Sequence, residues 1–110
     1  MTRARIVRLN EALAALPLPS EEVGFHDMWD ISLLRAPAVE FRMFAPREQD
    51  MQTPHDRDEA YLVARGNAVL DIGGVRHTLK AGDMAWVPAG VEHRFLVFSE
   101  DFATWAVFVG

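Results

Sequence analysis

Beyond residue 28 the sequence is a succession of short runs rich in β-branched and aromatic residues, with turn-forming residues between them. The runs recur at intervals of about 8–12 residues, and this spacing is typical of an all-β barrel or sandwich. The Gly73-Gly74 pair between two of the runs indicates a hairpin turn. We expect eight strands, within residues 28–35, 39–45, 60–66, 67–72, 75–80, 84–88, 93–98 and 102–110.

Two of these runs also predict which side chains are buried. Val39, Phe41 and Met43 alternate with Glu40 and Arg42, and this alternation is typical of a half-buried strand with its apolar side chains facing a core. The last run is almost entirely apolar, which predicts a strand that is buried on both faces.

One short helix is expected ahead of the strands, over residues 10–16. Asn10 is the candidate N-cap, Leu13 and Leu16 lie on one helical face, and Pro17 ends the pattern. We therefore divide the chain into an N-terminal helix and strand extension, residues 1–38, and a barrel, residues 39–110. A length of 110 residues suits one structural domain made of both parts.

The charge distribution argues against nucleic acid as a partner. The chain has 16 acidic and 11 basic residues, a net charge of −5. Arg3, Arg5 and Arg8 precede the first acidic residue, so the rest of the chain carries a net charge of −8 and would repel a phosphate backbone. The chain has no cysteine, and no apolar run approaches the roughly 18 residues of a membrane span. We expect a cytoplasmic protein without disulfides or a membrane segment.

Candidate metal ligands occur in the middle of the chain. His55 and Glu59 are four residues apart, so an extended chain would place both side chains on one face. Such a pair lacks one ligand of a 2-His-1-carboxylate site, which binds a divalent metal and leaves positions open for substrate or oxygen. His93 follows a turn that contains Pro88 and Gly90, and a rigid turn suits a ligand whose direction must be fixed.

The segment from Gly82 to His93 resembles the second motif of the cupin superfamily. Pro88 and Gly90 stand between these two residues at the spacing of that motif. The asparagine that usually follows the histidine by four residues is replaced by Val97.

The first cupin motif is matched in part. Counting back from Gly66, Glu59 falls on the glutamate of the motif and His55 on its second histidine. Thr53 stands in the place of the first histidine, so one of the usual ligands is replaced. A second register would put His55 in the first position and Arg57 in the second, but Glu59 would then lie too close for the motif.

The resemblance covers roughly residues 39–110, and it implies a double-stranded β-helix barrel of the cupin, or jelly-roll, type. It implies that His55, Glu59 and His93 hold a divalent iron, zinc, nickel or manganese ion. With a redox metal such a protein would be a dioxygenase, and with zinc or manganese an isomerase, a lyase or a similar enzyme on a small molecule. The resemblance also implies a homodimer.

Arg57 and Tyr61 are candidate substrate-binding residues. On an extended strand Arg57 shares the face of Glu59, where its guanidinium suits a carboxylate or phosphate on a small-molecule substrate. The alternative for Arg57 is a surface pair with Asp56 or Asp58, and the alternative for Tyr61 is packing in the core.

A second function stays open at this point. The replacement of the first histidine and of the motif asparagine favours a non-catalytic barrel that binds or senses a small ligand without a metal. The barrel architecture alone does not decide between this function and an enzyme, because one fold hosts many activities.

Overall fold

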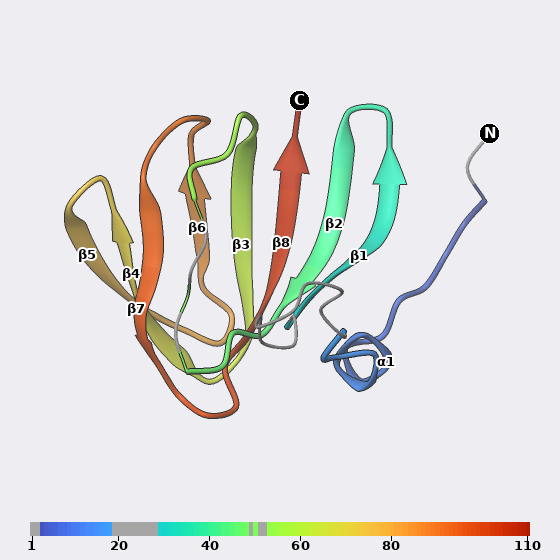
Figure 1. Cartoon of the computed structure of the whole chain (residues 1–110). Helices are drawn as coiled ribbons and strands as arrows, with labels where there is room; N and C mark the ends of the chain where they lie inside the picture. Colours follow the sequence, from blue (N-terminus) through green and yellow to red (C-terminus); the bar gives the residue numbers. More distant parts are fainter. Residues whose placement is uncertain (1–2, 19–28, 49, 51–52) are drawn as a thin grey trace, which may run out of the picture.

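The computed structural model describes residues 3–18, 29–48, 50 and 53–110 (Figure 1). Each of the eight expected runs forms a strand, with ends that differ from the expected ones by at most two residues. The elements are α1 (Leu9–Ala14), β1 (Asp30–Ala36), β2 (Val39–Phe44), β3 (Asp58–Arg65), β4 (Asn67–Ile72), β5 (Val75–Lys80), β6 (Met84–Val87), β7 (His93–Phe98) and β8 (Ala103–Val109). No helix of the described ranges is long and apolar enough to cross a membrane.

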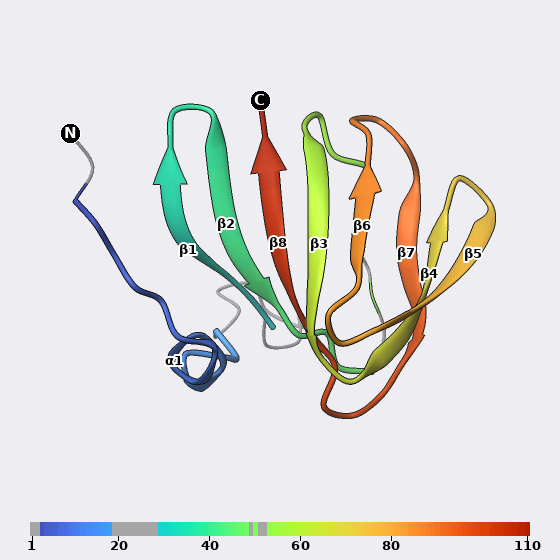
Figure 2. The ribbon, with the colours of Figure 1, turned by 180° about the vertical axis from the view of Figure 1, so that it is seen from behind.

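The strands form two antiparallel sheets. The larger sheet has the order β1-β2-β8-β3-β6 and the smaller one the order β5-β4-β7 (Figures 1 and 2). This arrangement confirms the all-β, double-stranded β-helix architecture with one short N-terminal helix. The last strand, β8, lies between β2 and β3 in the larger sheet. The prediction that it is buried on both faces is wrong in part, because Thr104, Ala106 and Phe108 are buried whereas Val109 is 40 % exposed.

The main core fills the space between the two sheets. It is centred on Phe95, whose ring lies 5.0 Å from that of Tyr61 and 4.9 Å from that of Phe102, between centroids. Tilted and edge-on pairs at such distances add stability beyond the apolar surface that they bury. The buried members of this cluster come from both sheets and from the turn before β8: Tyr61, Val63, Ala68, Leu70, Leu79, Val87, Phe95, Phe102 and Ala106.

A second, smaller cluster joins α1 to the larger sheet. Ala12 of the helix is buried with Met43 of β2 and Ala103 of β8. The helix begins at Leu9, one residue earlier than expected. The predicted N-cap is wrong: Arg8 occupies the N-cap position without a side-chain cap.

Asn10 has a different role from the one predicted. Its side-chain oxygen accepts a hydrogen bond of 2.8 Å from Nη2 of Arg65 at the end of β3. The amide therefore ties the helix to the larger sheet rather than satisfying the first backbone N–H groups of the helix.

The burial prediction for β2 is also wrong in part. Its side chains alternate between the two faces, but Glu40 is buried while Phe41 is 38 % exposed. Glu40 pairs in register with Phe108 of β8, and Phe108 pairs with Glu59 of β3, so the three side chains share the inner face of the sheet. The charged side of β2 therefore faces into the barrel, and its apolar side faces out.

Candidate metal centre

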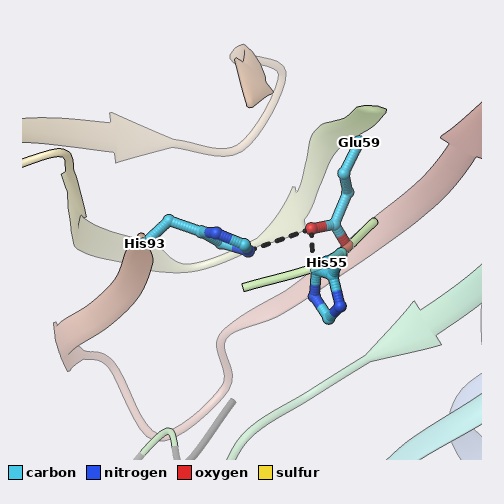
Figure 3. Close-up of side chains that lie close together, drawn as sticks. All are labelled: His55, Glu59 and His93. Carbon is cyan, nitrogen blue, oxygen red and sulfur yellow. Dashed lines mark hydrogen bonds and ion pairs between the residues drawn. The ribbon is translucent and has the colours of Figure 1, made fainter. Parts of the chain in front are cut away.

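Three side chains from different parts of the chain converge inside the barrel (Figure 3). Glu59 lies at the start of β3 in the larger sheet, and His93 is the first residue of β7 in the smaller sheet. His55 belongs to the segment that leads into β3. Nε2 of His93 lies 3.1 Å from Oε1 of Glu59, and Nε2 of His55 lies 3.6 Å from the same oxygen. The structure therefore brings together the three residues that the sequence predicted as ligands.

The three residues differ in their access to solvent. The side chains of Glu59 and His93 are 3 % and 1 % exposed, whereas that of His55 is 29 % exposed. A small molecule would therefore approach the cluster from the side of His55. A cleft of about 270 Å³ is lined by Thr53, Pro54, Asp71, Glu92, His93, Arg94 and Leu96.

The turn ahead of His93 is tied to the segment that carries His55. The backbone N–H of Gly90 donates to the carbonyl oxygen of His55 over 2.7 Å. The N–H of Ala89 donates to Oδ1 of Asp58 over 2.8 Å. Gly90 has a φ of +79°, a conformation that residues with a side chain reach only at a cost. The Pro-Ala-Gly turn thus fixes where two candidate ligands enter the barrel.

The ring of His93 is held in one orientation. Its Nδ1 lies 2.9 Å from the carbonyl oxygen of Val91, which can only accept a hydrogen bond, so Nδ1 carries a proton. Nε2 then faces the carboxylate of Glu59, and either a second proton or a cation must lie between them. Histidine ligands of metals are held through their other nitrogen in the same way.

The pKa of His93 reflects this environment. Burial by itself would lower the pKa, but the hydrogen bonds to Glu59 and to the Val91 carbonyl, together with the negative charges of Glu59 and Asp50, raise it above its ordinary value. The contact of 3.1 Å between Nε2 of His93 and Oε1 of Glu59 therefore favours the protonated form of the ring.

The donor set fits a divalent metal ion. Two imidazole nitrogens and one carboxylate oxygen are ligands that iron, zinc, nickel and manganese accept. The three ligand atoms lie within 4.8 Å of one another. Atoms bound at about 2.0–2.2 Å to one ion lie at most roughly 4.4 Å apart, so only a small contraction is needed. Among the described residues this is the one group of His, Cys, Asp and Glu side chains that is arranged to hold an ion.

Aromatic rings support the two histidines. The ring of Phe108 meets that of His55 edge-on at 4.8 Å, and the two histidine rings lie 5.1 Å apart. Tyr61 lies 6.1 Å from His93 and is fully buried in the main core. Tyr61 therefore packs in the core, which the sequence analysis gave as the alternative to substrate binding. A contact between Tyr61 and substrate stays a prediction.

Arg57 lies beside the three residues and pairs with neither Asp56 nor Asp58. Its Nη2 donates to Oε1 of Glu40 over 3.1 Å, and its guanidinium carbon lies 4.5 Å from the centre of the Phe108 ring. Because Phe108 also touches the ring of His55, the positive charge stands next to the open side of the cluster. The side chain of Arg57 is 38 % exposed.

Glu40 is the residue at this site that the sequence analysis missed. Its carboxylate accepts hydrogen bonds from Ser32, Arg35, Arg42 and Arg57. Burial alone would raise its pKa, but the hydrogen bonds from Ser32, Arg57 and Arg42 outweigh burial and lower the pKa to about 2. The carboxylate is therefore charged at neutral pH and holds three guanidinium groups around it.

Asp30 completes this polar network at its far end. Its Oδ1 accepts a hydrogen bond of 2.9 Å from Nε of Arg42. Burial raises the pKa of Asp30, although the ion pair with Arg42 opposes that effect. Sequence patterns do not reveal this network, because only the pairing of β1 with β2 and of β2 with β8 brings its members together.

The fold agrees with the comparison with known families. The family model of the cupin domain matches residues 41–109. The chain belongs to the cupin family.

Relatives of this cupin extend the comparison. A curated protein of Streptomyces coelicolor, the uncharacterized protein SCO3923, is 41 % identical over 59 residues, which cover 54 % of this chain. The aligned part of the cupin spans 56 % of the length of that relative.

Solved structures share the fold of this cupin. Protein NMB1881 of Neisseria meningitidis matches with a TM-score of 0.69 and 22 % identity over 96 % of this chain and 100 % of that one. A cupin-2 domain containing protein of Shewanella frigidimarina matches with a TM-score of 0.68 and 18 % identity over 96 % and 95 %. The DMSP lyase DddQ of Ruegeria pomeroyi matches with a TM-score of 0.66 and 17 % identity over 74 % and 46 %.

Proposed function

We propose that this cupin binds a divalent metal ion through His55, Glu59 and His93 and acts there on a small molecule. The observation that carries the proposal is the convergence of both imidazole Nε2 atoms on one carboxylate oxygen, at 3.6 and 3.1 Å. The fixed hydrogen bond from Nδ1 of His93 to Val91 supports it, because it aims the lone pair of Nε2 at the same point. Iron would make the protein a dioxygenase, whereas zinc or manganese would suit an isomerase or a lyase.

The proposed function gives the residues around the triad different roles. A bound divalent ion would polarise an oxygen of the small molecule or hold it beside dioxygen. The rings of His55 and Phe108 border the side from which the molecule arrives. Arg57 offers its guanidinium there, which favours a molecule with a carboxylate or phosphate group.

The arginines beside the triad support an anionic molecule in particular. The network around Glu40 contains Arg35, Arg42 and Arg57 against Glu40 and Asp30, so these five groups carry a net positive charge. This positive region lies inside a chain whose net charge is −5. Arg42 and Arg57 are 21 % and 38 % exposed, whereas Arg35 is 73 % exposed, so Arg42 and Arg57 are the arginines that are shielded enough to attract an anion towards the site.

Metal analysis of protein purified without a histidine tag tests the proposal. We expect close to one divalent ion per chain in the wild type and loss of most of it in His93→Ala. The matched control is His77→Ala, because His77 is an exposed histidine of β5 that lies outside the triad. Full occupancy in His93→Ala would contradict the assignment of the ligands.

The second candidate is a cupin that binds a small ligand without a metal. It is favoured by the direct hydrogen bond between His93 and Glu59, which satisfies both buried groups when His93 is protonated. The replacement of the first motif histidine by Thr53 points the same way. A wild-type protein that stays free of metal after dialysis against each of the four ions would select this function.

A further inference from the structure

Two buried carboxylates stand on either side of one aromatic residue on the inner face of the larger sheet. Phe108 of β8 pairs in register with Glu40 of β2 and with Glu59 of β3, and the three strands are neighbours in Figure 1. Adjacent strands lie about 4.8 Å apart, so the backbones of the two glutamates are separated by roughly 10 Å. Glu40 and Glu59 are 5 % and 3 % exposed. A cation placed over Phe108 therefore has two alternative anionic partners.

Arg57 is such a cation. Its guanidinium carbon lies 4.5 Å from the centre of the Phe108 ring, and its Nη2 donates to Oε1 of Glu40 over 3.1 Å. Arg57 lies directly before β3, two positions ahead of Glu59 in the chain. A long side chain whose backbone is close to Glu59 thus extends over Phe108 to the carboxylate of β2.

Glu40 uses its two oxygens for separate partners. Oε2 accepts hydrogen bonds from Ser32, Arg35 and Arg42. Oε1 accepts the bond from Arg57. The carboxylate is charged at neutral pH, because its hydrogen bonds lower the pKa to about 2 against the opposing effect of burial. One oxygen of a charged group therefore holds the guanidinium of Arg57.

We propose that Glu40 is a positioning residue of the site: it holds the guanidinium of Arg57 over Phe108 and so prevents an ion pair between Arg57 and Glu59. The consequence for metal binding rests on the proposed function, in which Glu59 is the carboxylate ligand. A guanidinium paired with Glu59 would engage the carboxylate that the metal needs. Its positive charge would also repel a divalent ion beside it.

This placement agrees with the substrate-binding role proposed for Arg57. A guanidinium has five N–H donors, and the bond to Glu40 uses Nη2. Phe108 also contacts the ring of His55, whose side chain is 29 % exposed, so Arg57 lies next to the side from which a small molecule would approach. Glu40 thus keeps Arg57 near an arriving anionic group and away from the carboxylate of Glu59.

A crystal structure of Glu40→Gln, grown in metal-free buffer, tests the placement itself. The amide keeps the shape of the side chain but removes its negative charge, so Glu59 is then the one carboxylate paired in register with Phe108. We expect a guanidinium nitrogen of Arg57 within about 3.2 Å of a carboxylate oxygen of Glu59. A guanidinium that stays beside residue 40, or that turns into solvent, would overturn the proposal.

The affinity for Zn²⁺, measured by competition with a chromophoric chelator, tests the consequence in a double-mutant cycle. Glu40→Gln should weaken Zn²⁺ binding roughly ten-fold or more, as the loss of groups that support metal ligands does. Arg57→Gln should restore the affinity in the Glu40→Gln background. In the wild type, where Glu40 already holds the guanidinium, Arg57→Gln should change the affinity by no more than about two-fold. Equal effects of Arg57→Gln in both backgrounds would show a general effect of charge and would contradict the proposal.

Arg35→Gln is the matched control. Arg35 also donates to Glu40, but it lies on β1 and its side chain is 73 % exposed. Added to Glu40→Gln, it removes the same charge from the same network and should leave the Zn²⁺ affinity low. If circular dichroism shows that Glu40→Gln alone is unfolded, this double variant replaces it in the crystal structure, because it contains one arginine fewer without an anionic partner. Restoration of Zn²⁺ binding by Arg35→Gln would refute a specific role of Arg57.

The two experiments separate this inference from the proposed function. If the wild type binds no divalent ion, the proposed metal site fails, while the position of Arg57 in the Glu40→Gln crystal still decides the role of Glu40. If the wild type binds Zn²⁺ but Arg57 does not approach Glu59 in the variant, the role of Glu40 fails and the metal site stands.

Discussion

The interior of the barrel has two regions that are built in opposite ways. In one region, the rings of Tyr61, Phe95 and Phe102 pack at 4.9 and 5.0 Å within the main core. In the other, a layer of ionisable groups fills the space, with Glu59 between two histidines and Glu40 among its arginines. The first region removes apolar surface from water and stabilises the fold. The second takes charged groups out of water, which costs free energy unless every one of them is paired.

The comparison indicates which region serves function. A barrel of this size would be at least as stable if apolar side chains replaced the ion pairs, since buried pairs can often be replaced in this way without loss of stability. In the described part of the chain no buried polar side-chain atom lacks a hydrogen-bond partner. Stability alone does not explain a layer of paired charged groups beside His55, Glu59 and His93. Proteins place such groups in their interior mainly at functional sites, so we assign this layer to ligand binding.

The largest effect is expected in the ring region. Phe102→Ala removes a fully buried ring that contacts Phe95, and it should lower the free energy of unfolding by about 3–5 kcal/mol. Urea unfolding measures this difference. The control in the charged layer is His55→Ala, because that side chain is 29 % exposed and should change the stability by less than about 1 kcal/mol. If both variants lose the same free energy of unfolding, the two regions do not differ in their contribution to stability.

A smaller and pH-dependent effect is expected at Glu40. Its pKa is lowered in the folded chain from 4.5 to about 2, so the unfolded chain binds more protons between these values. The stabilisation, of the order of 3 kcal/mol, is present above pH 4.5 and is lost as the pH falls towards 2. Glu40→Gln should therefore be less stable than the wild type at pH 7, and the difference should shrink steadily on acidification. A difference that stays constant with pH would show that packing, not charge, is the role of Glu40.

A smaller change in stability than at Phe102 or Glu40 is expected at the turn before β7. A Cβ atom on Gly90 would meet no atom within 4 Å, so Gly90→Val strains only the backbone, at a cost of about 1 kcal/mol. Because the N–H of Gly90 holds the carbonyl of His55, metal affinity should fall roughly ten-fold or more. Gly82→Val is the control, since Gly82 has a φ of +94° and the same open surroundings, but its N–H donates to the carbonyl of Val63 and not to that of His55. Equal affinities in the two variants would show that the turn matters only for folding.

The strands were predictable because their signals are local. Glycines with positive φ, such as Gly73 and Gly74, separate runs of β-forming residues, and turn residues do not need tertiary context to be recognised. The meeting of His55, Glu59 and His93 was predictable for another reason: the motif spacing encodes a tertiary contact. The misplaced N-cap at Asn10 shows the limit of a local rule, because a longer-range bond to Arg65 engages that side chain.

The inversion of β2 was not predictable from its own sequence. Alternation of Val39, Phe41 and Met43 with Glu40 and Arg42 shows that the strand has two faces, but not which one points inward. The usual assumption, that the apolar face is inside, fails where the interior holds charges and where the outer face carries an apolar patch. Residues from three separate parts of the chain form the network of Glu40, so only the register of the strands reveals it.

The contact between Glu59 and His93 joins two sheets that share no strand pairing within the described part of the chain. Glu59 belongs to the larger sheet and His93 to the smaller one. If the sheets separate while each keeps its own hydrogen bonds, this contact disappears, and the triad disappears with it. A ligand bound to the triad therefore contacts both sheets at once. Because it binds only while the sheets are together, it raises the free energy needed to separate them. The protection of β3 and β7 amides against hydrogen exchange should then rise with ligand concentration. Amide exchange in these two strands would therefore detect ligand binding at the triad.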